Sequence, residues 1–144
     1  MCDIRQQTNL KTKTVYKVVY KANGKYYAVF SGLRLEIGFV QKMLRFDSVI
    51  EDDNKDASIL QSFNSFHKTS STCYNPLMSG RTSGFSSLKA AEILARCCYP
   101  SIILKIQLGG SILKGTSANI LRDPTFQRYI TYAGTEVLSI KEIE

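Results

Sequence analysis

The stretch TVYKVVYKANGKYYAVFSG, residues 14–32, decides the fold because it alternates side-chain types on both sides of an Asn-Gly pair. A period of two is typical of a β-strand, since successive side chains point to opposite faces. Asn23 and Gly24 tolerate positive backbone φ, and a two-residue type I′ turn matches the twist of the strands that it joins. We therefore predict a β-hairpin in which Tyr20 lies opposite Tyr27.

The two faces of this hairpin differ in composition. One face holds Tyr16, Val18, Tyr20, Tyr27 and Val29, and the other holds Lys17, Val19, Lys21, Tyr26, Ala28 and Phe30. Because both faces are partly apolar, we expect the hairpin to lie centrally in a sheet.

Further strands are predicted along the chain. Residues 33–37 alternate apolar and polar side chains and predict a third strand. Residues 101–108, SIILKIQL, predict a buried strand that ends at the following glycine pair, and residues 135–140, TEVLSI, predict the last strand. Serine and glycine dominate residues 78–84, MSGRTSG, so we expect a flexible loop there.

Two segments have helical spacing of their apolar residues. SLKAAEILARCC follows a serine N-cap at Ser86 or Ser87, and a second helix is expected over residues 57–68. The order of elements predicts an α+β domain over residues 14–144, with a mainly antiparallel sheet that opens with the hairpin and one or two helices packed on one face. Residues 1–13 are polar and basic, and we expect them to be a flexible N-terminus.

The net charge of +7 is unevenly distributed. Residues 1–45 carry +7 and residues 57–135 carry +6, whereas residues 46–56 carry −4 and residues 136–144 carry −2. A basic body with one acidic segment indicates a polyanionic or acidic partner. The alternative is that these charges serve solubility alone, because +7 is within the range that solubility explains.

Cellular location is also predicted from composition. The chain contains no apolar run near the roughly 20 residues of a membrane span, and its first 13 residues lack the apolar core of a signal peptide. We expect a cytoplasmic protein without membrane contact, in which Cys2, Cys73, Cys97 and Cys98 are free thiols.

Metal and cofactor chemistry find little support in the sequence. His67 is the single histidine, and the cysteines do not form a C-x-x-C pair, so we expect no metal site and no cofactor. Residues 80–84, GRTSG, precede a helix and could hold an anion through Arg81 and backbone N–H groups, but they lack the G-K-[ST] ending of a phosphate-binding loop. A solvated connection is the alternative interpretation of this segment.

Three segments are similar in layout to the second half of some ADP-ribosyltransferases. They are GFSSLKAAEILA, IILKIQLGG and GTEVLSIKEI. In that family a Ser-Thr-Ser strand precedes a helix, and a glutamate near the last strands holds the nicotinamide ribose. The resemblance assigns the glutamate to Glu136 and the serine to Ser83 or Ser86. The chain departs from the family pattern because it has no Ser-Thr-Ser strand and has Gly134 two residues before Glu136. The implied function is an ADP-ribosyltransferase-like or nucleotide-binding enzyme that uses Glu136.

Three blocks resemble a set of small phage-encoded proteins of unknown function. The blocks are VYKVVYKANGKYYAVFSG, GFSSLKAAEILAR and GTEVLSIKEIE, in that order. The resemblance implies a phage or mobile-element origin and brings no catalytic residues. Small basic phage proteins of this class often bind host machinery, including defence systems, so the resemblance implies action in the host cytoplasm.

These observations together favour a non-enzymatic binding protein. We expect it to inhibit a host defence component in the manner of an anti-CRISPR protein, and its partner to be a host protein or ribonucleoprotein complex, with RNA as one candidate. The predicted contact residues are Lys17, Lys21, Lys25, Tyr26, Phe30 and Arg81. Lysines would meet phosphates and rings would stack on unpaired bases. The alternative interpretation of the hairpin is packing, because tyrosines fill strand positions and lysines protect sheet edges from aggregation.

Overall fold

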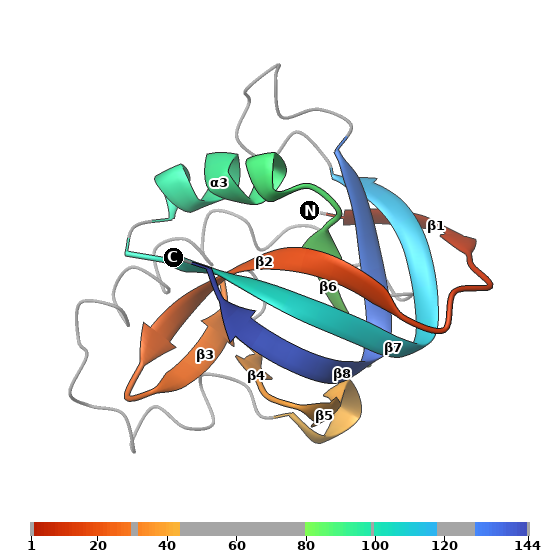
Figure 1. Ribbon diagram of the computed structural model, residues 1–144, viewed down its shortest axis with the longest axis horizontal. Helices are drawn as coiled ribbons and strands as arrows, with labels where there is room; N and C mark the ends of the chain where they lie inside the picture. The colour runs from red at the N-terminus through yellow and green to blue at the C-terminus, as the bar shows by residue number, and fades with distance from the viewer. Residues whose placement is uncertain (1, 30–31, 44–79, 99, 118–128, 144) are drawn as a thin grey trace.

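The computed structural model of the 144-residue chain describes residues 2–29, 32–43, 80–98, 100–117 and 129–143. These residues form a mainly antiparallel eight-stranded sheet and one α-helix, which confirms the predicted α+β class (Figure 1). The elements are β1 (Cys2–Gln7), β2 (Lys13–Ala22), β3 (Lys25–Ala28), β4 (Arg34–Leu35), β5 (Gly38–Phe39), a 3₁₀ turn η1 (Val40–Lys42), β6 (Thr82–Phe85), α3 (Leu88–Cys97), β7 (Ile102–Ser117) and β8 (Ile130–Glu142).

The β2–β3 hairpin has the predicted register. Tyr20 lies opposite Tyr27, and the turn residues Asn23 and Gly24 have φ values of 52° and 76°. Positive φ at both turn positions is the requirement of a type I′ turn, which Asn-Gly meets at little cost. The local sequence signal therefore suffices to place these two strands.

The strand pairings of the sheet close into a ring. β2 pairs with β7, β7 pairs with β8, β8 pairs with β6, and β6 returns to β2 through Tyr16 opposite Phe85. β7 and β8 are long and bent, so that each contributes to more than one side of the ring (Figure 1). A core cluster packs within it, comprising Val15, Val19, Leu35, Val40, Met43, Leu104, Ile106, Leu108, Ile112 and Val137.

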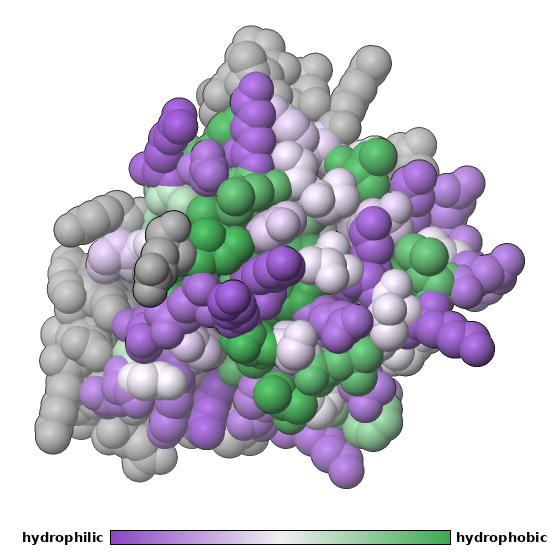
Figure 2. All heavy atoms as spheres, in the orientation of Figure 1, coloured by the Kyte–Doolittle hydropathy of each residue, from purple (hydrophilic) through white to green (hydrophobic). Residues whose placement is uncertain are grey.

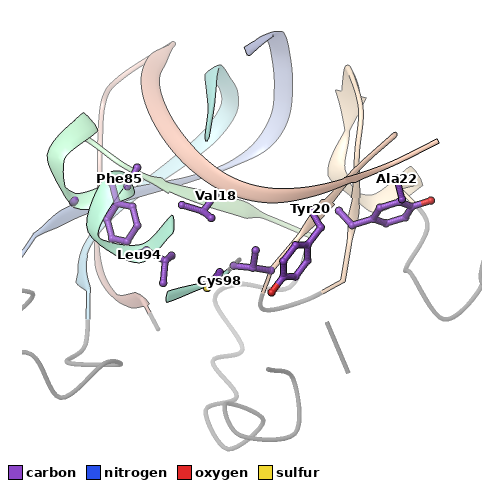
Figure 3. Close-up of a cluster of buried hydrophobic side chains, with 10 residues drawn as sticks. Val18, Tyr20, Ala22, Phe85, Leu94 and Cys98 are labelled. Atoms are coloured by element: carbon purple, nitrogen blue, oxygen red, sulfur yellow. The ribbon is translucent and has the colours of Figure 1, made fainter. Parts of the chain in front are cut away.

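A second core lies between the sheet and α3. The helix begins after Ser87, one of the two predicted N-cap positions, although the Ser87 side chain makes no capping hydrogen bond, and it buries Ala90, Ala91 and Leu94 against the sheet. Figure 3 shows Leu94 and Cys98 directed toward side chains of β2, among them Val18 and Tyr20. The apolar face of the hairpin is therefore the one that the helix covers, and the lysine-bearing face turns toward the other core.

The strand predicted over residues 101–108 continues through the glycine pair. Gly109 lies opposite Glu136 and Ile112 lies opposite Gly134, so two β7 residues face the single residue Thr135 in a β-bulge. Gly110 has a φ of 71°, and the Ser111 N–H donates to Thr135 Oγ1 over 3.0 Å. The predicted end of the strand was wrong because glycine permits a bulge as readily as a turn.

Residues 82–85 form β6 where residues 78–84 were expected to be a flexible loop. Thr82 to Phe85 pair with Gly134 to Thr131 on β8. A Cβ on Gly84 would lie 2.6 Å from Val15 Cγ2, so glycine at this position lets β6 approach β2. Glycine here serves close packing of two strands, which a local composition argument cannot detect.

Three further differences concern the ends of elements. Residues 2–7, expected to be flexible, form β1 and pair with β7 from Gln7 opposite Leu113 to Cys2 opposite Ser117. The third strand is shorter than predicted, at Arg34–Leu35, and the last strand is longer, at Ile130–Glu142. The helix predicted over residues 57–68 and the acidic segment 46–56 lie outside the described residues.

Candidate functional site

Lys21, Tyr26 and Glu142 form a polar cluster at the exposed end of the hairpin. Lys21 on β2 lies opposite Tyr26 on β3, and Glu142 is the last residue of β8. Lys21 Nζ lies 3.0 Å from Glu142 Oε2, and the Tyr26 hydroxyl donates to the same oxygen over 2.9 Å. Lys21 Nζ is also 5.8 Å from the centroid of the Tyr26 ring, which is within cation–π range.

The electrostatics of this cluster follow from the shared carboxylate. Hydrogen bonds from Lys21 and Tyr26 hold the pKa of Glu142 below its usual value. The same hydrogen bond raises the pKa of Lys21. Partial burial, and then the hydrogen bond to Glu142, raises the pKa of Tyr26. At neutral pH the cluster therefore contains a carboxylate, an ammonium and a neutral phenol, and the Lys21 side chain remains 43% exposed.

Lys17 occupies a structural position between Val15 and Val19, both fully buried on the same face of β2. Its Nζ donates to the backbone oxygen of Ser83 over 2.7 Å. The bond joins β2 to β6 near the place where only Tyr16 and Phe85 pair the two strands. Lys17 thus contributes to closure of the strand ring, and it does not lie beside Lys21 as an exposed contact residue.

The structure places the other predicted contact residues apart from the cluster. Lys25 is half-buried on β3 opposite Ala22, and alternation puts its side chain on the face away from Tyr26. Arg81 Nη2 donates to Ser111 Oγ over 2.8 Å, at the bulge of β7, whereas the hairpin lies beside the first residues of β7. Phe30 lies outside the described residues. Of the six predicted residues, Lys21 and Tyr26 are brought into contact with each other.

Sequence reasoning did not find Glu142 as the partner of the hairpin. The residue lies more than 100 positions from Lys21, and no local pattern connects the two segments. The available signal was its position two residues after the predicted last strand, 135–140, which could return to the sheet beside the hairpin.

A second polar surface lies on the outer side of β2, β7 and β8. It is a partly open depression of about 240 Å³ lined by Thr14, Lys105, Ile106, Gln107, Ser139 and Lys141. Lys105 was recognisable in the sequence as the one charged position within the apolar strand SIILKIQL, but this residue was not singled out.

The residues of the enzyme alternative lie on the sheet. Glu136 is half-buried on β8, opposite Gly109 on β7 and Phe39 on β5. Ser83 on β6 lies opposite Ala133, and its backbone oxygen accepts the Lys17 hydrogen bond. Ser86 follows β6, and its N–H donates to the Ile130 oxygen over 3.0 Å.

Two adjacent thiols differ sharply in environment. Cys97 is exposed, and Cys98 is buried beneath α3. Burial, with a smaller contribution from Cys97, raises the pKa of the Cys98 thiol to about 12. Both residues are free cysteines, and the structure of the described residues gives Cys98 the character of an inert core residue.

Within the described residues, no group of three or more histidine, cysteine, aspartate or glutamate side chains is arranged to hold a metal ion. In the same part of the chain, no helix combines the length and apolar character needed to cross a membrane. His67 lies outside the described residues. Comparisons with protein-family models, curated proteins and solved structures found no match.

Proposed function

We propose that this chain is a non-enzymatic binding protein of phage type that inhibits a host defence component through a basic aromatic surface. The partner is an RNA–protein effector or its nucleic acid, met in the cytoplasm of the host cell. The observation that carries the proposal is the Lys21–Tyr26 pair, which Glu142 holds in a fixed arrangement at the exposed end of the hairpin.

The arrangement suits contact with a polyanion. Glu142 occupies one hydrogen-bonding direction of the Lys21 ammonium, and an ammonium has three donors, so further donors face solvent. A fixed lysine loses less side-chain entropy when it binds than a mobile lysine does. The net charge of +7 attracts a negatively charged partner over distances of about a Debye length.

The proposal is tested by capture from host lysate with immobilised protein at two salt concentrations. Lys21→Ala and Tyr26→Ala should reduce the captured material, and higher salt should reduce it further. Lys89→Ala is the matched control, because Lys89 is an exposed lysine on α3. Equal capture by the wild type and both hairpin variants would rule out this surface as the binding surface.

Nuclease treatment of the lysate separates the two kinds of partner. Loss of capture after treatment indicates contact through nucleic acid, and persistence indicates contact with protein. Lys17→Ala is unsuitable for this experiment, because Lys17 bonds β2 to β6 and its loss would disturb the fold.

A further inference from the structure

Two lysines lie directly opposite each other on the outer face of the sheet. Lys105 on β7 is in register with Lys141 on β8, and Tyr16 on β2 lies on the other side of Lys105. Cross-strand neighbours in register have Cβ atoms about 4.5–5.5 Å apart and point to the same face. The row Tyr16, Lys105, Lys141 therefore brings two ammonium groups together beside a half-buried ring.

This arrangement is unfavourable for the fold by itself. Like charges directly opposite on neighbouring strands are destabilising. Among the residues that the structure describes, neither lysine has a carboxylate within ion-pair distance. The adjacent Glu142 points to the other face and contacts Lys21. An anion seated between Lys105 and Lys141 would convert this repulsion into attraction.

A second row of polar side chains lies beside the lysines. Thr14, Gln107 and Ser139 are in register across β2, β7 and β8, and they line the depression of about 240 Å³ together with the two lysines. In Figure 1, β7 and β8 run side by side across the front of the view, and Figure 2 shows hydrophilic side chains there among apolar ones. Hydroxyl and amide groups both donate and accept hydrogen bonds, whereas ammonium groups only donate.

We propose that this depression, called the groove from here on, binds single-stranded RNA. Lys105 and Lys141 contact one phosphate of the backbone, and Thr14, Gln107 and Ser139 contact the adjacent riboses. The 2′-hydroxyl both donates and accepts, so it matches side chains that do the same. The groove is partly open to solvent, which suits a strand that crosses the sheet better than an enclosed metabolite.

The inference rests on the proposed function, since it takes the partner to contain RNA, but it locates the RNA on a different surface. Lys141 and Glu142 are neighbours on β8 and therefore point to opposite faces. The groove and the Lys21–Tyr26 pair can thus be altered independently.

The test is fluorescence anisotropy with a labelled oligouridine of about 12 nucleotides and a deoxyoligonucleotide of matching sequence. Lys105→Gln with Lys141→Gln should weaken RNA binding by about tenfold or more and should lower the slope of log affinity against log salt by roughly 0.7 in total, because the two lysines neutralise one phosphate. Lys89→Gln should leave both quantities unchanged. Thermal unfolding should show the double variant to be at least as stable as the wild type, because it removes a repulsive pair.

Ribose contacts have their own variants. Gln107→Leu and Ser139→Ala should reduce the preference for RNA over the deoxyoligonucleotide while leaving the salt slope unchanged. Amide resonances of Thr14, Lys105, Gln107, Ser139 and Lys141 should shift on addition of the RNA.

Each opposing result has a defined meaning. Equal affinity for the two oligonucleotides overturns the assignment to RNA. If the double variant binds RNA as well as the wild type does, and Lys21→Ala loses RNA binding, the groove is not the RNA site. That result leaves the proposed function standing. Nuclease-resistant capture of host protein without RNA binding does the same. Failure of both capture and RNA binding overturns both proposals.

Discussion

Lys17 shows how the environment of a charged residue can give it a structural role where a binding role was predicted. Its position in an alternating strand indicates a solvent-facing lysine, but fully buried valines flank it on the same face and its Nζ bonds to the Ser83 oxygen. Lys17→Met keeps most of the stem and leaves that oxygen without this donor. We expect a loss of about 1–3 kcal/mol in the free energy of unfolding, measured by urea denaturation.

Lys89→Met serves as the control for Lys17→Met, since Lys89 is exposed on α3 and its replacement should change stability by no more than about 0.5 kcal/mol. Equal stability of the two variants would show that the Lys17 hydrogen bond does not support the ring.

Glu142 makes the stability contributed by the hairpin cluster depend on pH. Its pKa is lowered in the folded chain, first by the hydrogen bond from Lys21 and then by that from Tyr26. A carboxyl whose folded pKa is depressed contributes stability above its unfolded pKa and loses that contribution as pH falls through the folded pKa. We therefore expect the stability difference between wild type and Glu142→Gln to be largest near neutral pH and to vanish in acid.

Carbon-detected NMR titration measures the Glu142 pKa directly. Lys21→Met should raise it toward the ordinary value, and Tyr26→Phe should raise it by less, because the Lys21 hydrogen bond is the largest contribution. A Glu142 pKa that does not respond to Lys21→Met would contradict the geometry of the cluster.

Cys97 and Cys98 should differ in reactivity although they are adjacent. Burial raises the Cys98 pKa to about 12, so almost none of it is thiolate at pH 8, and the core also blocks access. We expect iodoacetamide to modify Cys97 readily and Cys98 only after denaturation, as measured by peptide mass spectrometry on Cys97→Ser and Cys98→Ser variants. Rapid labelling of Cys98 in the native Cys97→Ser protein would show that the core under α3 opens.

At the scale of elements, close approach of β6 to β2 depends on Gly84. A Cβ there would lie 2.6 Å from Val15 Cγ2 and 3.0 Å from the Tyr16 oxygen. Gly84→Ala should therefore cost about 1–3 kcal/mol of unfolding free energy by overpacking. Ser139→Ala, an exposed change on β8, is the control and should have little effect.

A double-mutant cycle identifies the cause of the Gly84→Ala loss. Val15→Ala removes Cγ2, the nearest of the atoms that a Cβ on Gly84 would meet, so the double variant should lose less stability than the sum of the two single variants. Additive losses would mean that the cost does not come from contact with the Val15 Cγ2 atom, and would leave the Tyr16 oxygen and the Val15 Cβ as the close β2 contacts.

The elements that could be predicted are those with local signals. Asn23-Gly24 and the alternation around it suffice for the hairpin, and the apolar stripe after the serine pair suffices for α3. β6 and the continuation of β7 could not be predicted, because Gly84 and Gly110 are needed for contacts with distant strands. Local composition predicts turns at such glycines, whereas pairing with distant strands places them within β-strands.

At the scale of the whole molecule, the candidate site could also be predicted only as far as local sequence signals reach. The basic and aromatic character of the hairpin was visible in the sequence, and so was the predicted pairing that brings Lys21 opposite Tyr26. Ring closure brings Lys17 to Ser83 on β6, and these two residues are 66 positions apart in the chain. It also brings Glu142 to Lys21, and these two are 121 positions apart. The Lys105–Lys141 pair likewise appears only when β7 and β8 are set in register.

The ring also predicts how the molecule tolerates truncation. Among the described strands, β1 pairs with the second half of β7 alone and takes no part in the pairings that close the ring. Deletion of residues 2–7 should therefore lower the midpoint of urea denaturation while leaving a single cooperative transition. It should also expose the β7 edge from Leu113 to Ser117, and an unpaired edge promotes association between chains. We expect sedimentation velocity to show concentration-dependent self-association.

The matched comparison for this deletion is a break within the ring. Ile106 on β7 lies between Val15 on β2 and Ile140 on β8, so Ile106→Pro removes a backbone donor and imposes its ring at a position paired on both sides. That variant should lack a cooperative transition altogether. If the deletion abolished cooperativity as completely as Ile106→Pro does, β1 would belong to the unit that holds the fold together, and the ring alone would not account for its stability.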